Sequence, residues 1–91
     1  MRTSPAQLPV VRLTEQATRD IRQLPSHVVD RLEGIFDRLS RWPDVSGVER
    51  IKYHPAGYYR IRTGDWRVVF RPEGPNIVVD RVLHRSKAYE R

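Results

Sequence analysis

The sequence predicts a small α+β domain in which a two-helix hairpin packs on one face of a twisted, mostly antiparallel sheet of about four strands. Three observations predict this fold. Apolar residues recur at helical spacing across residues 14–42, two alternating runs flank a Gly-Asp pair in residues 58–71, and another strand-like run covers residues 77–85. The chain has 91 residues, which suits one domain, and we expect a single domain over residues 1–91. The expected order is strand, helix, helix and then three strands.

The first expected strand lies in the apolar run at residues 8–13. Pro9 has no N–H to donate to a neighbouring strand, so it favours an edge position or the start of a strand. We expect residues 1–7 to be a flexible lead-in, because they lack the apolar run of a signal peptide. No apolar stretch approaches the roughly 20 residues of a membrane span. The sequence therefore predicts a cytoplasmic protein with no membrane partner.

Two helices are expected next, separated by a Leu-Pro-Ser break at residues 24–26. Thr14 is the expected N-cap of the first helix and Ser26 that of the second. Trp42 is expected to end the second helix, because a residue that precedes a proline is pushed out of the α region. The positions expected to face the core recur at intervals of three and four residues. They are Ala17, Ile21, Leu24, Val28, Val29, Leu32, Ile35, Phe36 and Leu39.

The Gly64-Asp65 pair is typical of a two-residue hairpin turn, and such a turn fixes which residues of the two strands face each other. It places Arg62 opposite Arg67. Because side chains alternate between the two faces of a strand, the hairpin has an apolar face and a basic face. The apolar face, expected to meet the helices, carries Tyr59, Ile61, Thr63, Trp66, Val68 and Phe70. The basic face carries Tyr58, Arg60, Arg62, Arg67, Val69 and Arg71.

The remaining segments are expected to connect and complete the sheet. We expect a loop at residues 44–49 and a short extended lead into the hairpin at residues 51–54. Residues 77–85 carry apolar side chains on both faces, as in a strand with neighbours on both sides. Residues 86–91 are expected to form a short C-terminal tail that carries Tyr89.

The charge of the chain favours an acidic partner. The formal net charge is +6 and the sequence pI is about 10.5. Like charges directly opposite each other in a sheet cost up to ~1 kcal/mol per pair, so we expect an anion on the basic face. The chain has no cysteine, no metal-ligand spacing of His, Asp and Glu, and no glycine-rich nucleotide loop. The sequence therefore predicts neither a metal nor a cofactor.

Two segments resemble the RelE/ParE superfamily of toxins of type II toxin–antitoxin systems. One is the hairpin from Tyr59 to Phe70, and the other is the chain ending from Val82 to Tyr89. With the order of elements, the resemblance covers about residues 10–89. It implies a RelE-like fold and a cognate antitoxin as partner. RelE-like members cleave messenger RNA, usually in the ribosomal A site and without a metal, whereas ParE-like members poison DNA gyrase.

The resemblance also implies a set of functional residues. RelE-like sites use two basic residues on the second strand, an arginine on the third, an arginine at the end of the fourth and a tyrosine near the C-terminus. These positions read Arg60, Arg62, Arg67, Arg85 and Tyr89 in this chain. The match favours the RelE-like branch, a metal-independent endoribonuclease (mRNA interferase) that inhibits translation. Further contacts with nucleic acid are expected from Lys52, Tyr58, Arg71 and Arg81.

The implied chemistry is attack of a 2′-hydroxyl on the adjacent phosphate, and arginine suits the phosphate oxygens. We assign the three hairpin arginines to the phosphate, Arg85 to the leaving-group side, and Tyr89 to the 2′-hydroxyl or to stacking on a base. The proton acceptor is missing from this set, because arginine has a pKa above ~12 and is a poor base. His84 is a further candidate for the proton acceptor. The alternative is that the His84 ring has no part in the reaction and is hydrogen-bonded on the helix side of the sheet.

Two other functions stay open at the level of sequence. Arg81-Val82-Leu83-His84 also looks like the last strand of gyrase-poisoning relatives, which favours a DNA gyrase poison without nuclease activity. The net charge alone is compatible with a non-catalytic basic module that binds RNA or an acidic protein.

Overall fold

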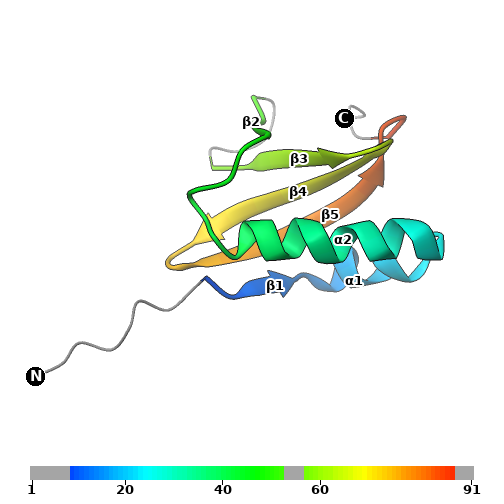
Figure 1. Cartoon of the computed structure of the whole chain (residues 1–91), viewed down its shortest axis with the longest axis horizontal. Coiled ribbons are helices and arrows are strands. Elements are labelled where there is room, and N and C mark those ends of the chain that lie inside the picture. Colours follow the sequence, from blue (N-terminus) through cyan, green and yellow to red (C-terminus); the bar gives the residue numbers. More distant parts are fainter. Residues whose placement is uncertain (1–8, 53–56, 88–91) are drawn as a thin grey trace, which may run out of the picture.

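The computed structural model describes residues 9–52 and 57–87 of the chain. In these residues two helices cover one face of a single sheet of five strands (Figure 1). The helices are α1 (Glu15–Arg22) and α2 (Ser26–Leu39). The strands are β1 (Val11–Leu13), β2 (Val48–Arg50), β3 (Tyr59–Thr63), β4 (Trp66–Glu73) and β5 (Asn76–His84). The predicted fold class is confirmed, with one strand more than expected.

The additional strand is β2, in a segment where the sequence predicts a loop. The strand order across the sheet is β1-β5-β4-β3-β2, so β2 is an edge strand that pairs antiparallel with β3. Its three residues are too few to give a strand pattern of their own, and their extended conformation comes from pairing with the hairpin. β1 forms the other edge and runs parallel to β5. The predicted edge position of the first strand is therefore correct.

The helices begin and end close to the predicted residues. The Thr14 hydroxyl accepts a hydrogen bond from the Ala17 N–H, so the predicted N-cap of α1 is confirmed. The prediction for Ser26 is wrong, because this residue is the first helical residue of α2 and Pro25 holds the cap position without a side-chain bond. α2 ends at Leu39, three residues before Trp42. No helix in the described part of the chain is long and apolar enough to cross a bilayer.

The core lies between the helices and the apolar face of the sheet. Its fully buried large side chains include Leu32 and Leu39 from α2 and Phe70 and Ile61 from the hairpin. Trp42 packs edge-on against both Tyr59 and Phe70, with ring centroids 5.2 and 5.4 Å apart, respectively. This aromatic cluster closes the core at the end of α2, next to the strands that carry the basic face.

The register of the hairpin agrees with the prediction from its turn. Arg62 faces Arg67, and the pairing continues in step to Tyr59 and Phe70. Gly64 adopts a φ of +61°, a left-handed conformation that L side chains rarely take. The local turn chemistry therefore fixes which side chains share the basic face.

Gly64→Ala is expected to destabilise the protein and Gly34→Ala to stabilise it. The left-handed conformation costs a non-glycine residue roughly 1–2 kcal/mol, and a Cβ at position 64 would also lie 2.7 Å from Arg31 Nη1. Gly34 lies inside α2, and a methyl group added there would have nothing within 4 Å, so alanine should gain about 0.8–1 kcal/mol. Urea unfolding of the two variants tests the pair. Shifts of both midpoints in the same direction would contradict it.

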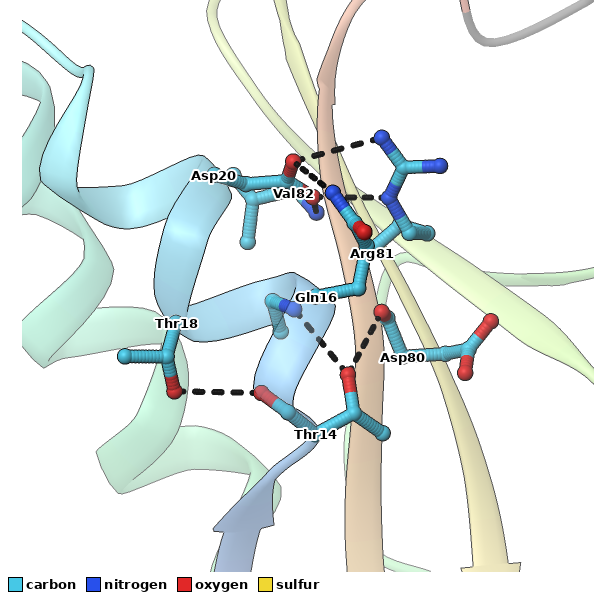
Figure 2. Close-up of polar contacts among 8 residues, drawn as sticks. Thr14, Gln16, Thr18, Asp20, Asp80, Arg81 and Val82 are labelled. Carbon is cyan, nitrogen blue, oxygen red and sulfur yellow. Dashed lines mark hydrogen bonds and ion pairs between the residues drawn. The ribbon is translucent and has the colours of Figure 1, made fainter.

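The free edge of β5 is held by the N-cap residue Thr14 and by Asp20 of α1 (Figure 2). β1 pairs with β5 only as far as Val79, where β1 ends, and on the other side of β5 the β4–β5 ladder skips Asp80 in a β-bulge. The Thr14 N–H donates to the Val79 carbonyl and the Thr14 hydroxyl to the Asp80 carbonyl. The Asp20 carboxylate then accepts the Val82 N–H at 2.9 Å. α1 thus satisfies the backbone groups that the short strand β1 leaves unpaired.

Candidate functional site

A carboxylate joins two of the predicted site arginines on the basic face. Glu49 on β2 faces Arg60 on β3 in the ladder. Its Oε1 accepts a hydrogen bond from Arg60 Nε at 2.9 Å, and its Oε2 accepts one from Arg62 Nη2 at 3.1 Å. We call these three residues the Glu49 cluster. The sequence predicted an anion on this face, and the chain supplies one itself.

The electrostatics of the Glu49 cluster favour the charged carboxylate. Hydrogen bonds from Arg60 and then from Arg62 lower the pKa of Glu49 below its ordinary value of 4.5. The side chains of Glu49 and Arg62 are about half exposed, at 43% and 53%. The Glu49 carboxylate is therefore ionised at neutral pH, and with Arg62 it lies within reach of solvent and ligands.

An open pocket of about 390 Å³ lies beside the cluster, at the β2 edge of the sheet. It is lined by Arg38, Gly47, Val48, Glu49, Ile61 and Arg62. Arg38 from α2 holds the rim in place by donating to the Ser46 carbonyl at 2.6 Å. The pocket gives an incoming group access to Glu49 and Arg62 from the sheet edge.

Arg67 does not join the Glu49 cluster. Its side chain turns toward the hairpin turn, where Nη1 donates to the carbonyls of Gly64 and Trp66 at 3.0 and 3.1 Å. Arg67 is 7% exposed, and its Nε has no hydrogen-bond partner within residues 9–52 and 57–87. Arg62 and Arg67 therefore diverge although their backbones are paired, and this relieves the repulsion that the register alone implies.

Arg85 lies at the same turn as Arg67. Its backbone N–H donates to the Asp65 carbonyl at 2.7 Å, and its Nε lies 3.7 Å from Asp65 Oδ1. Both side chains are about two-thirds exposed, so this ion pair is weak and easily exchanged for another anion. Tyr89, the fifth predicted catalytic residue, lies outside the described residues.

His84 faces the helix side of the sheet, across from the arginines. Its ring packs edge-on against Trp66 at a centroid distance of 5.2 Å, and the two residues are paired in the ladder. Its Nδ1 is 3.0 Å from Ser86 Oγ. This position agrees with the helix-side alternative that the sequence left open, and it separates the imidazole from the Glu49 cluster.

The four residues predicted to contact nucleic acid occupy different surroundings. Lys52 is exposed just after β2. Arg71 donates to Glu73 at 3.0 Å, and this bond, with a further one to Tyr58, raises the pKa of Arg71. Arg81 reaches around the edge of β5 to Asp20, with Nε 2.8 Å from Oδ2 (Figure 2). Arg81 is thus already engaged in holding α1, whereas Lys52 remains exposed to solvent.

The basic face carries apolar surface beneath its charges. Val69 and Val78 are 4% and 7% exposed although they lie on the face away from the helices. In the ladder Val69 lies between Arg60 and Arg81, and Val78 lies beside Arg71. Arginine stems cover such apolar residues while the guanidinium groups stay in water. In the described part of the chain, no group of three His, Cys, Asp or Glu side chains is arranged to hold a metal.

Glu49 is the residue of the site that sequence reasoning missed. Its segment reads as a polar loop, and only its pairing with β3 places the carboxylate beside Arg60. The signal in the sequence was weak, because Glu49 is a single glutamate between Val48 and Arg50, and most glutamates in such polar segments are simply exposed to solvent. The register of β3 was predictable, but the strand that pairs with it was not.

Comparison with known proteins agrees with the fold. Residues 11–89 match the sequence model of the family described as the ParE toxin of the type II toxin-antitoxin system parDE. Toxin RelE3 of Methanocaldococcus jannaschii is 31% identical over 77 residues, which cover 79% of this chain and 85% of that protein. The matched region contains the hairpin and both helices.

Two similar solved structures are antitoxin–toxin complexes. The RelB-RelE complex from Methanococcus jannaschii matches with a TM-score of 0.72 at 25% identity, over 87% of this chain and 95% of that one. The RelBE2 complex from Mycobacterium tuberculosis matches with a TM-score of 0.74 at 28% identity, over 86% of this chain and 99% of that one.

Proposed function

We propose a function for this chain, which belongs to the RelE/ParE superfamily of toxins of type II toxin–antitoxin systems. The proposed function is that of a metal-independent endoribonuclease that cleaves mRNA. The proposed site of action is the ribosomal A site in the cytoplasm, and the proposed outcome is inhibition of translation. The observation that carries the proposal is the Glu49 cluster. It presents two guanidinium groups to an oxyanion on an exposed face of a rigid sheet.

The two arginines of the cluster suit a phosphate in both geometry and charge. A guanidinium offers a planar set of donors that stays charged at every physiological pH. Arg60 and Arg62 come from one strand, so their backbones hold them at a fixed spacing on one face. Donors that are already in place where negative charge develops are often the largest single contribution to catalysis. We assign both arginines to the phosphate oxygens of the transition state.

The proposed reaction breaks the bond between phosphorus and the 5′-oxygen. The 2′-hydroxyl oxygen attacks the adjacent phosphorus and loses its proton, which yields a 2′,3′-cyclic phosphate and a 5′-hydroxyl after the leaving oxygen is protonated. Glu49 is the ionised carboxylate that the described residues place at the two arginines, and we assign the 2′-hydroxyl proton to it. Arg85 is proposed for the leaving-group side, Tyr89 for orienting the 2′-hydroxyl or stacking on a base, and Arg67 for the turn end of the phosphate site.

We further propose a cognate antitoxin as the physiological partner. The RelB-RelE and RelBE2 structures are complexes of that kind. The basic face and the formal net charge of +6 suit an acidic segment, which can fold as it covers the site. The same charge suits the ribosome and mRNA, so antitoxin and substrate are expected to exclude each other.

Mapping of mRNA ends on translating ribosomes tests the proposed function. Purified toxin should generate new 3′ ends within coding sequences, with cyclic phosphate termini, and prior dialysis of the toxin alone against EDTA should leave this activity unchanged. The Arg60→Ala/Arg62→Ala variant should produce none, because it lacks both phosphate ligands, while its circular dichroism spectrum stays that of the wild type. Intact mRNA at stoichiometric toxin would overturn the proposal.

A DNA gyrase poison is the second candidate, and the description of the matching family favours it. Such a protein would act by binding gyrase and would leave RNA untouched. Cleaved DNA trapped in a gyrase assay, with mRNA intact in the ribosome assay, would establish this alternative. The Arg60→Ala/Arg62→Ala variant would then keep its toxicity, since the phosphate site has no part in that mechanism.

A further inference from the structure

We propose that Glu49 is a built-in competitor for the substrate phosphate and thereby sets the anion selectivity of the site. This inference rests on the proposed function, in which Arg60 and Arg62 bind a phosphate of RNA. In the free protein the Glu49 carboxylate takes the position at these arginines that the phosphate requires. RNA must therefore exchange one anion for another when it binds.

The contacts of Glu49 are those that a phosphate oxygen would make. Oε1 accepts from Arg60 Nε at 2.9 Å and from Arg62 Nη2 at 3.3 Å, and Oε2 accepts from Arg62 Nη2 at 3.1 Å. Guanidinium groups bind carboxylates and phosphates with the same arrangement of donors. One group therefore excludes the other from the same donors.

The structure also lets the carboxylate leave without unfolding the sheet. The backbone of Glu49 is fixed by its pairing with Arg60, whereas its side chain is 43% exposed and lines the open pocket at the sheet edge. Rotation of the side chain away from the arginines opens the guanidinium donors that held the carboxylate and breaks no backbone hydrogen bond. The fixed backbone keeps the rotated carboxylate at the edge of the site, from which it can take the 2′-hydroxyl proton of the bound RNA. The pair with Arg62 is exposed, and such pairs are worth only about 0.2–1 kcal/mol, whereas the Arg60 side chain is 20% exposed, so its contact is the stronger of the two that a phosphate must displace.

Competition of this kind discriminates between small and polymeric anions. With Glu49 ionised, the cluster has a net charge of +1 in place of the +2 of its two arginines. A lone inorganic phosphate gains little by replacing the carboxylate. An RNA strand has further phosphates for basic residues outside the cluster, such as Lys52, and these contacts favour the exchange. The free toxin is thereby protected from occupation by abundant small anions.

Glu49→Gln in the full-length protein tests the inference, with Glu15→Gln as the matched control. Both changes remove one negative charge, but Glu15 is 87% exposed on α1 and pairs with Arg19, away from the basic face. Two probes are used. Binding of inorganic phosphate is followed by the ¹⁵N chemical shifts of the arginine Nε groups. Binding of a fluorescent oligonucleotide, with 2′-deoxy substitutions that prevent its cleavage, is followed by fluorescence anisotropy.

Glu49→Gln should bind both probes about threefold to tenfold more tightly at low salt, because one exposed contact with Arg62 and one partly buried contact with Arg60 no longer have to be exchanged. The larger gain should be for inorganic phosphate. For the oligonucleotide, the slope of the logarithm of the association constant against the logarithm of the salt concentration should steepen by about 0.7. The reason is that the variant has no carboxylate at the arginines, so one more phosphate charge is neutralised on binding. The Glu15→Gln protein should bind as the wild type does.

Equal gains in the two variants would show a general charge effect and overturn the inference, as would unchanged binding by Glu49→Gln. Should that variant fold poorly, the wild type gives a second measurement. The ¹³C shift of the Glu49 carboxyl must move on addition of the oligonucleotide, and a constant shift would also overturn the inference. If wild-type toxin cleaves mRNA while Glu49→Gln binds no more tightly, the inference fails and the proposed function stands. If Glu49→Gln binds the probes more tightly but the wild type cleaves no mRNA, competition by Glu49 stands and the proposed function fails.

Discussion

Glu49→Gln is expected to slow mRNA cleavage by roughly 10²- to 10⁴-fold, the range that general base catalysis contributes. Glutamine has the size of glutamate and a carbonyl oxygen that can still accept from one arginine, but it cannot take the proton of the 2′-hydroxyl. Single-turnover cleavage on programmed ribosomes measures the effect. Because the same variant should bind a non-cleavable oligonucleotide more tightly, the loss should appear in the rate at saturation and not in the half-saturating concentration.

The pH dependence of the same reaction tests Glu49 as the base. The arginine hydrogen bonds lower the pKa of Glu49 below 4.5 in the free toxin, and a carboxyl group that has given up these bonds to a phosphate has an ordinary pKa of about 4.3, so Glu49 is ionised throughout the neutral range in both states. With Glu49 as the base, the rate at saturation should stay constant between about pH 6 and 8. An acid limb within this range would show that a group other than Glu49 takes the proton. Glu15→Gln provides the control for loss of one charge and should cleave as the wild type does.

Asp20→Ala is expected to cost about 3 kcal/mol of unfolding free energy and to lower the melting temperature by roughly 10–20 °C. The Asp20 side chain is 11% exposed. It accepts from Arg81 Nε at 2.8 Å, from Arg81 Nη2 at 3.2 Å and from the Val82 N–H at 2.9 Å. Its removal leaves a backbone donor at the edge of β5 without its partner and releases α1 from the sheet.

The contribution of Asp20 depends on pH with a defined sign. Burial opposes ionisation of this carboxyl, but the hydrogen bonds from Arg81 and Val82 and the charge of Arg81 together lower its pKa below 3.8. A group whose pKa is lower in the folded state than in the unfolded state stabilises the folded protein at pH values above its unfolded-state pKa. This stabilisation is lost as the pH falls through the folded value. The difference between the wild type and Asp20→Ala should therefore shrink below about pH 3.8.

Thermal and urea unfolding measure both effects, and Asp37→Ala is the matched control. Asp37 forms an exposed i,i+4 pair with Arg41, so its loss should change the unfolding free energy by less than about 0.5 kcal/mol. A double-mutant cycle with Arg81→Ala isolates the ion pair from the Val82 hydrogen bond. Equal melting temperatures for Asp20→Ala and the wild type would contradict the assignment of Asp20 as the link between α1 and β5.

The sequence by itself determined the elements whose interactions are local. The turn at Gly64 set the register of the hairpin, and with it the basic face and the apolar face. Helical spacing identified Leu32 and Leu39 as core residues, and Thr14 as the cap of α1. These predictions succeed because they depend on side-chain periodicity and on hydrogen bonds between residues a few positions apart.

The tertiary structure alone decided how the charged side chains on that face are used. Glu49 reaches Arg60 only because β2 joins the sheet, and Arg81 reaches Asp20 across 61 positions of the chain. Arg67 shares a face with Arg62 but turns to the carbonyls of the hairpin turn. Periodicity assigns a long side chain to a face. It does not say which counter-charge that side chain meets there, because the choice depends on segments that packing brings together from distant parts of the sequence.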